Sequence, residues 1–327
     1  MHFVKRACFA VIALAIVSAG SASASSTNLA YDELTKLVTG PTPQPGSWDT
    51  DYQAALSAAN AAANAPTHHG LFGGIQNAIQ AGENAAKSLT SGFLTRHYFM
   101  NGWERTDDVA SQSATIDKPD KHQIIHLDLA KKTYYIQDTS AQPYMEAPPT
   151  YARPGPPGPP PPSPQPGTGK LDISVTSTSV GSQTLDNVAT TGYSLDFKAT
   201  MTQATGSCSN GSFETSMLQY LSSYAEPQLA PSGSKPMVKP ALPPMAMMGG
   251  GQHPGCSPTT MTHKVGGVVV PSGRLALWEL VSLKAGSTQG SGSFSTLVER
   301  GNVRTLGSSD ESLFEIPAGF TQTQQNS

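Results

Sequence analysis

The stretch that decides the fold runs from His122 to Gln137 and reads HQIIHLDLAKKTYYIQ. Two strand-like runs, residues 122–128 and 133–137, are separated by a short polar segment through Lys131 and Lys132. Strand-like runs joined by a short polar loop are typical of a β-hairpin. The stretch therefore predicts a pair of antiparallel strands within a β-rich domain.

Further strand-like runs lie on both sides of this hairpin. Short apolar or alternating runs, separated by Gly-rich turns and without any βαβ alternation, favour an antiparallel sheet that is curved or barrel-like. The predicted fold is mainly β with accessory helices: a curved antiparallel sheet or a half-open barrel. The runs outside the hairpin are residues 93–103, 171–176, 186–202, 265–270, 275–283 and 294–298.

Two regions predict helix. Residues 25–91 are rich in Ala, which favours helix, but they hold few large apolar residues, so this N-terminal region is expected to be helical or partly disordered. Within the β-rich part, residues 212–224 place apolar side chains at helical spacing and are followed by Pro227, which predicts one helix there. Those apolar side chains are Phe213, Met217, Leu218, Leu221 and Tyr224.

Two Pro/Gly-rich insertions interrupt the β domain, which is expected to span residues 92–320 and to end in a polar tail, 321–327. Residues 153–169 have the composition of a solvated polyproline II segment. Such a segment could bind an aromatic groove of a partner, but we interpret it as an exposed spacer inside one domain. The second insertion, residues 227–258, is irregular and holds the run Gly249–Gly251.

The N-terminus has the three parts of a secretory signal peptide. Lys5 and Arg6 precede an apolar run from Phe9 to Val17, and Ala22-Ser23-Ala24 is a small-residue cleavage motif. The alternative, a membrane anchor, would need about 20 apolar residues. The sequence thus predicts that residues 1–24 are removed near Ala24 and that the protein is periplasmic or secreted, with no later transmembrane segment.

The overall charge excludes some partners. Charged residues make up 13% of the 327 residues and the formal charge is -3. Removal of Lys5 and Arg6 leaves 18 basic and 23 acidic side chains, a charge of -5. A mildly acidic chain lacks the positive field of a nucleic-acid-binding protein, so no nucleic-acid partner is expected.

The cysteine count predicts one disulfide. Cys8 lies in the signal peptide, which leaves Cys208 and Cys256. An even number of cysteines in an exported chain favours a structural bridge, worth about 4 kcal/mol for a loop of roughly fifty residues. The alternative, a metal or redox pair, is disfavoured because the spacing is unlike C-x-x-C.

No metal or cofactor is expected. The helical zinc motif H-E-x-x-H needs a Glu where this chain has Gln123, and in a strand His122 and His126 would lie about 13 Å apart. The loop around Met237, Met245, Met247, Met248 and His253 carries soft ligands that suit Cu(I), but it has no regular Met spacing, and copper binding stays an alternative.

Motifs of known catalytic chemistry are also missing from the sequence. It holds no G-x-S-x-G nucleophile elbow, no P-loop and no dinucleotide-binding glycine fingerprint. A pair of carboxylates assembled by the fold would leave no such motif. The protein is therefore expected not to be an enzyme, and two inward-facing carboxylates with perturbed pKa values would favour the opposite.

A family resemblance emerges from three segments. The aromatic-to-acidic run 98–108, the hairpin 124–136 and the ending Leu-Phe-Glu-Ile-Pro-Ala-Gly-Phe at 313–320 resemble exported bacterial domains of unknown function. Several of these are similar to the outer-membrane lipoprotein carrier proteins. That resemblance implies a half-open antiparallel barrel with a helical lid and a concave sheet that holds an apolar moiety such as an acyl chain.

The leading hypothesis is therefore a non-catalytic binding or carrier protein of the cell envelope for a hydrophobic ligand. Its expected apolar lining comprises Ile124, Ile173, Leu195, Leu277 and Phe314. A filled core in place of an apolar cavity would contradict it. The alternative is a structural or protein-interaction component of the envelope that uses the Pro-rich segments.

Overall fold

The computed structural model describes residues 28–38, 40–63, 91–140, 167–229, 256, 258–287 and 290–324. The expected signal peptide, almost all of the Pro/Gly tract and the Met-containing loop lie outside the described residues, as does the Ala-rich run after residue 63. The elements are β1 (Leu29–Val38), α1 (Trp48–Ala63), β2 (Phe93–Met100), β3 (Trp103–Asp108), β4 (Ser113–Lys118), η1 (Pro119–Lys121), β5 (Gln123–Asp128), β6 (Thr133–Asp138), β7 (Lys170–Leu185), β8 (Val188–Thr202), β9 (Gly211–Ala225), β10 (Thr260–Gly267), β11 (Arg274–Ser287), β12 (Gly290–Thr305), η3 (Ser308–Phe314) and β13 (Thr321–Gln322).

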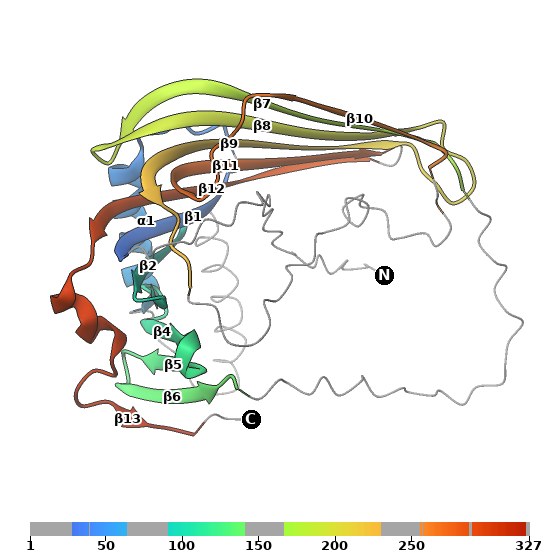
Figure 1. Cartoon of the computed structure of the whole chain (residues 1–327). Helices are drawn as coiled ribbons and strands as arrows, with labels where there is room; N and C mark the ends of the chain where they lie inside the picture. Colours follow the sequence, from blue (N-terminus) through green and yellow to red (C-terminus); the bar gives the residue numbers. More distant parts are fainter. Residues whose placement is uncertain are drawn as a thin grey trace, which may run out of the picture.

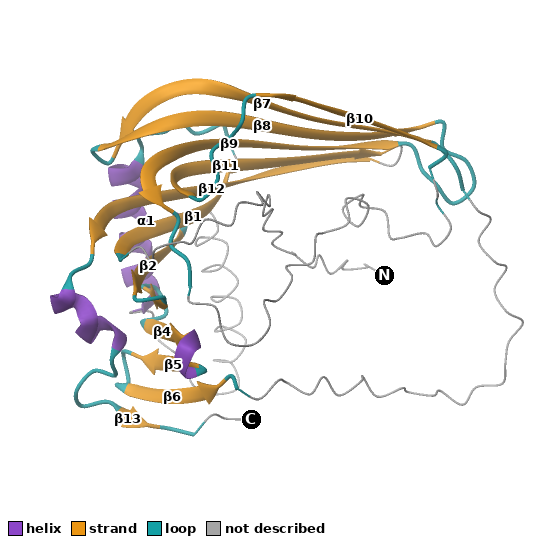
Figure 2. Ribbon diagram, in the orientation of Figure 1, coloured by secondary structure: helices purple, strands orange, loops and turns teal. Residues whose placement is uncertain are grey.

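The described strands form one sheet, in the order β10-β7-β8-β9-β11-β12-β1-β2-β3-β4-β5-β6-β13. Neighbours are antiparallel except at the two edges, where β10 pairs with β7 and β13 pairs with β6 in parallel. The sheet is strongly curved and does not close (Figures 1 and 2). The predicted curved, open antiparallel sheet is confirmed.

The sheet has two halves that differ in strand length. The short-strand half, β2–β6, has strands of six to eight residues, and the long-strand half, β7–β9 with β11 and β12, has strands of 14 to 16 residues. In the short-strand half, left-handed residues such as Asn101, Gln112 and Lys132 turn the chain after each strand. The long pair β7–β8 turns only at Asp186 and Asn187.

Residues directly opposite each other on neighbouring strands share a face of the sheet. Leu34 of β1 lies opposite Glu299 and Leu94, and all three are on the face that carries α1, whose Trp48 packs over Gly301. We call this the outer face. The helix η3 also lies on the outside of the curve (Figure 1). The opposite side is the inner face.

The apolar side of the sheet differs between the short strands and the pair β7–β8. In the short-strand half the outer face is apolar: Ile116, Ile125 and Leu127 pack with Phe314 of η3. In the long-strand half, β7 and β8 place Leu171, Ile173, Leu195 and Phe197 inward, and their outward neighbours are polar or charged, among them Asp172, Ser174, Ser194, Asp196 and Lys198.

Two secondary-structure predictions are wrong. Residues 29–38, placed in the helical or disordered N-terminal region, form β1 in the middle of the sheet, although α1 confirms helix at 48–63. Residues 212–224 belong to strand β9 rather than to a helix. In the middle of β9, apolar residues lie on both faces, Met217 inward and Leu218 outward. Apolar residues on both faces break the period of two and mimic helical spacing.

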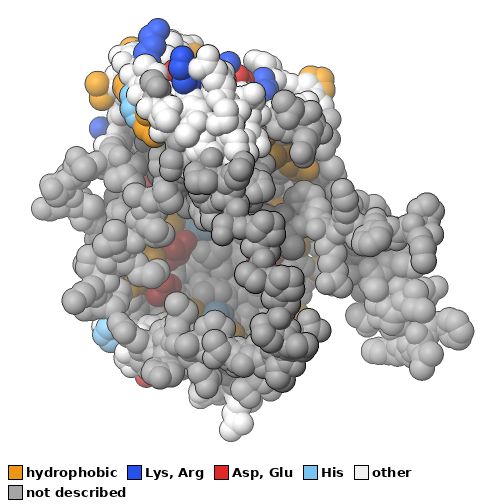
Figure 3. Space-filling model, turned by 90° about the vertical axis from the view of Figure 1, so that its right-hand side faces the viewer, with side chains coloured by type: hydrophobic (Ala, Val, Ile, Leu, Met, Phe, Trp, Pro, Cys, Tyr) orange, Lys and Arg blue, Asp and Glu red, His pale blue; other side chains and the backbone are white. Residues whose placement is uncertain are grey.

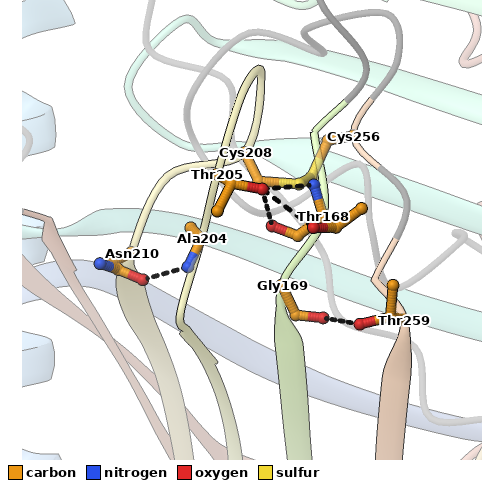
Figure 4. The surroundings of a disulfide bond; sticks show 8 residues. All are labelled: Thr168, Gly169, Ala204, Thr205, Cys208, Asn210, Cys256 and Thr259. Atoms are coloured by element: carbon orange, nitrogen blue, oxygen red, sulfur yellow. Dashed lines mark hydrogen bonds between the residues drawn. A yellow bond between two sulfur atoms is a disulfide. The ribbon is translucent and has the colours of Figure 1, made fainter.

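The predicted disulfide is present between Cys208 and Cys256. It ties the β8–β9 connection to the chain just before β10, close to the start of β7 (Figure 4). The Thr205 hydroxyl lies 2.9 Å from that of Thr168, and the backbone N–H of Thr259 donates to the carbonyl oxygen of Gly169 at 2.9 Å. The disulfide therefore holds together the β8–β9 connection and the starts of β7 and β10, at one end of the long-strand half.

Candidate ligand-binding face

The long-strand half places a continuous row of apolar side chains on the inner face. Along β8, Leu195, Phe197, Ala199 and Met201 point inward in succession, and their partners on β7 and β9 are largely apolar as well. We call this surface the apolar inner face. It comprises Leu171, Ile173, Val175, Leu195, Phe197, Ala199, Met201, Phe213, Met217, Val281, Leu283, Phe294 and Val298.

Exposure varies across the apolar inner face. Leu171, Ile173, Ala199 and Met201 are buried in one cluster. Phe294 is 48% exposed. The edge strand β10 adds Met261 and Val265, which share this face by register and are also exposed. The surface therefore combines a packed patch with accessible apolar side chains at its margins.

The structure brings three of the five predicted lining residues to the inner face. Ile173 and Leu195 lie on the apolar inner face, and Ile124 lies on the inner side of β5, because its neighbour Ile125 faces outward. Phe314 packs on the outer face against Ile125, so its assignment to a common lining is wrong.

Leu277 does not join that lining either. It sits at an irregularity of β11, between Ala276 and Trp278, and lines a cavity beside Trp48 of α1. Sequence reasoning selected Leu277 and Phe314 for their apolar character, whereas their position is fixed by the bulge in β11 and by η3.

A charged cluster occupies the inner face where the two halves meet. The Arg300 guanidinium donates from Nε to Glu33 at 2.8 Å and from Nη1 to the carbonyl oxygen of Ala276 at 2.8 Å. It also lies over the ring of Tyr31, 5.8 Å from the centroid. His97 stacks on Tyr31. Seen from its open side, the molecule is hollowed, with acidic and histidine side chains in the hollow (Figure 3).

Two more carboxyls approach this Arg300 cluster. Burial raises the pKa of both Glu226 and Glu279; the positive charge of Arg300 opposes the rise, and the negative charge of Glu33 adds to it. Glu279 stands two residues before Val281 on the inner side of β11. The inner face therefore passes from a charged region to an apolar one along the same strands.

The histidines of the hairpin do not form a metal site. His126 faces inward and stacks on Tyr135 with ring centroids 4.4 Å apart, while His122 precedes β5 in a left-handed conformation. In the described part of the chain no group of three or more His, Cys, Asp or Glu side chains could hold a metal ion. Met237 and His253 lie outside that part.

On the outer face, α1 docks beside the buried carboxyl of Glu299. Glu299, 2% exposed, accepts from the Ser47 hydroxyl at 3.1 Å and lies 3.7 Å from Lys36 Nζ. Lys36 also pairs with Asp51 of α1. Burial, together with Asp51, raises the pKa of Glu299 to about 7. Asp51 is stabilised in its charged form by Lys36, so Glu299 is the partner that holds the proton.

Sequence reasoning missed the residues of the Arg300 cluster. Glu33, His97, Glu226, Glu279 and Arg300 lie on different strands and connections, and only the register brings them together. Both β1 and β12 mix charged and apolar residues, with Glu33 in β1 and Arg300 in β12. That mixture does not indicate which face or which partners these charges have.

No protein-family model, no curated protein and no solved structure matches this chain. None of the described helices is both long enough and apolar enough to span a membrane.

Proposed function

We propose that the protein is an exported, non-catalytic carrier that holds a lipid or an acylated ligand on its apolar inner face. The observation that carries this proposal is the inward alternation of the long-strand half: β7 and β8 turn apolar side chains inward and Ser, Thr, Asp and Lys outward. In an isolated sheet layer, a stable apolar face needs a cover.

The accessible part of the face supports an acyl ligand. The inward side chains of β8 from Leu195 to Met201 extend over about 20 Å at 3.4 Å per residue. Ala199 and Met201 are buried, so the ligand would lie on the Leu195 end of this row and on the exposed margin at Phe294. The charged Arg300 cluster lies beyond the α1-proximal end of this row, so an amphipathic ligand would place its polar end there.

The test uses two neighbouring residues of β12 with opposite orientations. Phe294 faces inward and Ser293 faces outward, and both are exposed. The full mature chain, purified after export, would be titrated with a dansyl-labelled undecanoic acid and examined by native mass spectrometry for co-purified lipid. We expect Phe294→Asp to weaken probe binding at least tenfold and Ser293→Asp to leave it unchanged.

Equal effects of Phe294→Asp and Ser293→Asp would contradict the proposal, and so would a wild-type protein that neither carries lipid nor binds the probe. Circular dichroism of both variants establishes that the sheet is intact. Both substitutions add the same charge at adjacent exposed positions. A difference in probe binding between them therefore results from the face of the sheet that carries the charge, and not from the charge itself.

The Arg300 cluster supports a second candidate, acid–base catalysis by Glu226 and Glu279. Raised pKa values of two neighbouring carboxyls are typical of such pairs. Glu279→Gln separates the two candidates: a carrier keeps its binding of the dansyl probe, whereas an enzyme that turns over the co-purified lipid in vitro would lose that turnover.

A further inference from the structure

Strand β10 leaves a long edge of the sheet without a partner. The sheet ends at β10 on one side and at β13 on the other, and among the described strands β10 pairs with β7 alone. β13 has two residues, whereas β10 has eight and lies at the rim of the curved sheet (Figure 1). Unpaired backbone groups on an edge strand bind further strands, so proteins usually keep such edges short or cover them. The β10 edge is therefore a candidate interface.

The hydrogen bonds that β10 makes to β7 identify the backbone groups on the free edge. At the start of this parallel pairing, the N–H of Thr259 donates to the carbonyl oxygen of Gly169. Backbone groups of successive strand residues point to opposite sides, so the odd-numbered residues of β10 bond to β7. The N–H and C=O groups of Thr262 and Lys264 therefore point away from β7, toward the free edge.

Exposed apolar side chains gather on the same segment. Met261 and Val265 of β10 are both exposed, the second of them by 80%. Just beyond the strand, Val268 and Val269 are exposed as well. Single exposed apolar residues are ordinary, but a group of them in one segment marks an interaction site. β10 therefore offers an incoming strand both hydrogen-bonding groups and apolar area.

A second, antiparallel copy of β10 matches this strand when a twofold axis passes through His263, perpendicular to the sheet. This register keeps the inner faces of both copies on the same side and places Met261 opposite the partner's Val265. It also places Thr262 opposite the partner's Lys264, and the two His263 rings meet at the axis as an aromatic pair. An axis through Lys264 would instead place two ammonium groups directly opposite each other, which is destabilising.

The same register brings opposite charges together on the outer face. Asp172 of β7 is exposed and accepts from the Thr262 hydroxyl at 2.6 Å. The partner's Lys264 would lie two strands from Asp172, which is about 10 Å between Cα atoms. A lysine side chain spans most of that distance. Within the described residues, neither Lys264 nor Asp172 has an ion-pair partner, so the dimer would pair both charges.

We propose that the protein forms a homodimer in which two β10 strands pair edge to edge about a twofold axis at His263. Both free β10 edges are used in this contact, so the assembly closes at two copies and does not grow further. The sheet of one copy then continues into the other, with the two apolar inner faces on the same side. This inference goes beyond the carrier proposal, and its test measures association and not ligand binding.

The experiment is sedimentation equilibrium of the full mature chain over a wide range of concentrations. Wild type should show a reversible monomer–dimer equilibrium, which is weak because two single strands bury less than the roughly 1,600 Å² of a standard interface. Thr262→Pro removes an N–H of the free edge and keeps every N–H that bonds to β7, so it should weaken the dimer at least tenfold. Thr262→Val is the matched control, because it also removes the hydroxyl but keeps the N–H; it should leave dimerisation unchanged.

An exchange of charges tests the register. Lys264→Glu and Asp172→Lys each bring like charges together across the interface, and each should weaken the dimer severalfold. The double variant Lys264→Glu/Asp172→Lys restores opposite charges and should return the dissociation constant close to that of wild type. Circular dichroism of all variants establishes that the sheet is intact. This set also keeps the test decisive if Thr262→Pro does not fold.

Hydrogen exchange of individual amides locates the contact. The amides of Thr262 and Lys264 should become protected as the protein concentration rises, whereas the amide of His263, which bonds to β7, should be protected throughout.

Four results would overturn the proposal. The first is a monomer at every concentration, and the second is equal dimerisation of Thr262→Pro and Thr262→Val. The third is a double charge variant that associates no better than the single variants. The fourth is the formation of open-ended oligomers, because these require a contact other than the one between two β10 edges.

Discussion

The short-strand and long-strand halves share one sheet, yet β4 and β5 turn their apolar side chains to the outer face, whereas β7 and β8 turn theirs to the inner face. In the short-strand half, the chain covers its own apolar outer face with η3 and the segment after it, through Phe314, Ile316 and Phe320. In the long-strand half, the apolar inner face keeps exposed members such as Phe294 and Met261. The first half supplies its own cover, and the second offers a surface to something else.

The strongest test of this difference compares two phenylalanines. Phe314 is 0% exposed in the core of the short-strand half, so Phe314→Ala should cost about 3–5 kcal/mol of unfolding free energy. Phe294→Ala, on the exposed margin of the apolar inner face, should cost less than about 1 kcal/mol. Urea denaturation of both variants measures the two values. Similar costs would show that the apolar inner face is packed like a core.

The disulfide provides the next largest effect, and it is confined to the long-strand half. The double variant Cys208→Ser/Cys256→Ser removes a bridge between residues 48 apart in sequence. It should lower the unfolding free energy by about 2–4 kcal/mol. Hydrogen exchange should then increase at the β7 and β10 ends while β4 and β5 stay protected. A uniform increase in hydrogen exchange over both halves would contradict the expectation that the disulfide stabilises only the long-strand half.

The sequence predicted the β5–β6 hairpin better than the middle of the sheet, for a physical reason. The hairpin β5–β6 is specified locally, by two strand-like runs and the turn through Lys132. The location of β1 is not specified locally, since Leu29–Val38 becomes a strand only by pairing with both β2 and β12. The Arg300 cluster depends on that pairing and could not be predicted without it.

The junction of the two halves should make stability depend on pH. Burial raises the pKa of Glu299 from 4.5 to about 7, so the folded state binds more protons than the unfolded state between these values. The contribution of Glu299 to the unfolding free energy is fully present below about pH 4.5 and is lost as the pH rises to 7. The loss is about 3 kcal/mol, because each unit of pKa difference corresponds to 1.36 kcal/mol.

Glu299→Gln isolates this effect from the other acids. The variant should unfold like wild type at pH 4.5 and should be more stable by up to about 3 kcal/mol at pH 8, as measured by urea denaturation. Glu226 and Glu279 also have raised pKa values, and both make the unfolding free energy fall as the pH rises. Their effect is the same in wild type and in Glu299→Gln, so it cancels in the comparison. If the unfolding free energies of wild type and Glu299→Gln differed by the same amount at pH 4.5 and pH 8, the assignment of the proton to Glu299 would be refuted.

The smallest expected effect compares one ion pair from each half. In the short-strand half, Lys118 is 3% exposed, lies 4.3 Å from the centroid of Trp103 and donates to Glu315 at 3.0 Å. Glu315 is 65% exposed, so solvent screens its charge in part, and Glu315→Gln, which leaves the buried ammonium without that counter-charge, should cost about 1 kcal/mol. In the long-strand half, Lys198 and Glu214 pair on the polar outer face, where both are exposed.

Glu214→Gln should therefore cost less than about 0.5 kcal/mol, because solvent screens an exposed pair. Thermal unfolding at low and at high salt measures both variants, and salt should weaken the effect of Glu214→Gln more than that of Glu315→Gln. Equal costs in the two halves would mean that Lys118 is solvated in solution. In that case η3 does not cover the outer face, and the short-strand half would have an open apolar face as well.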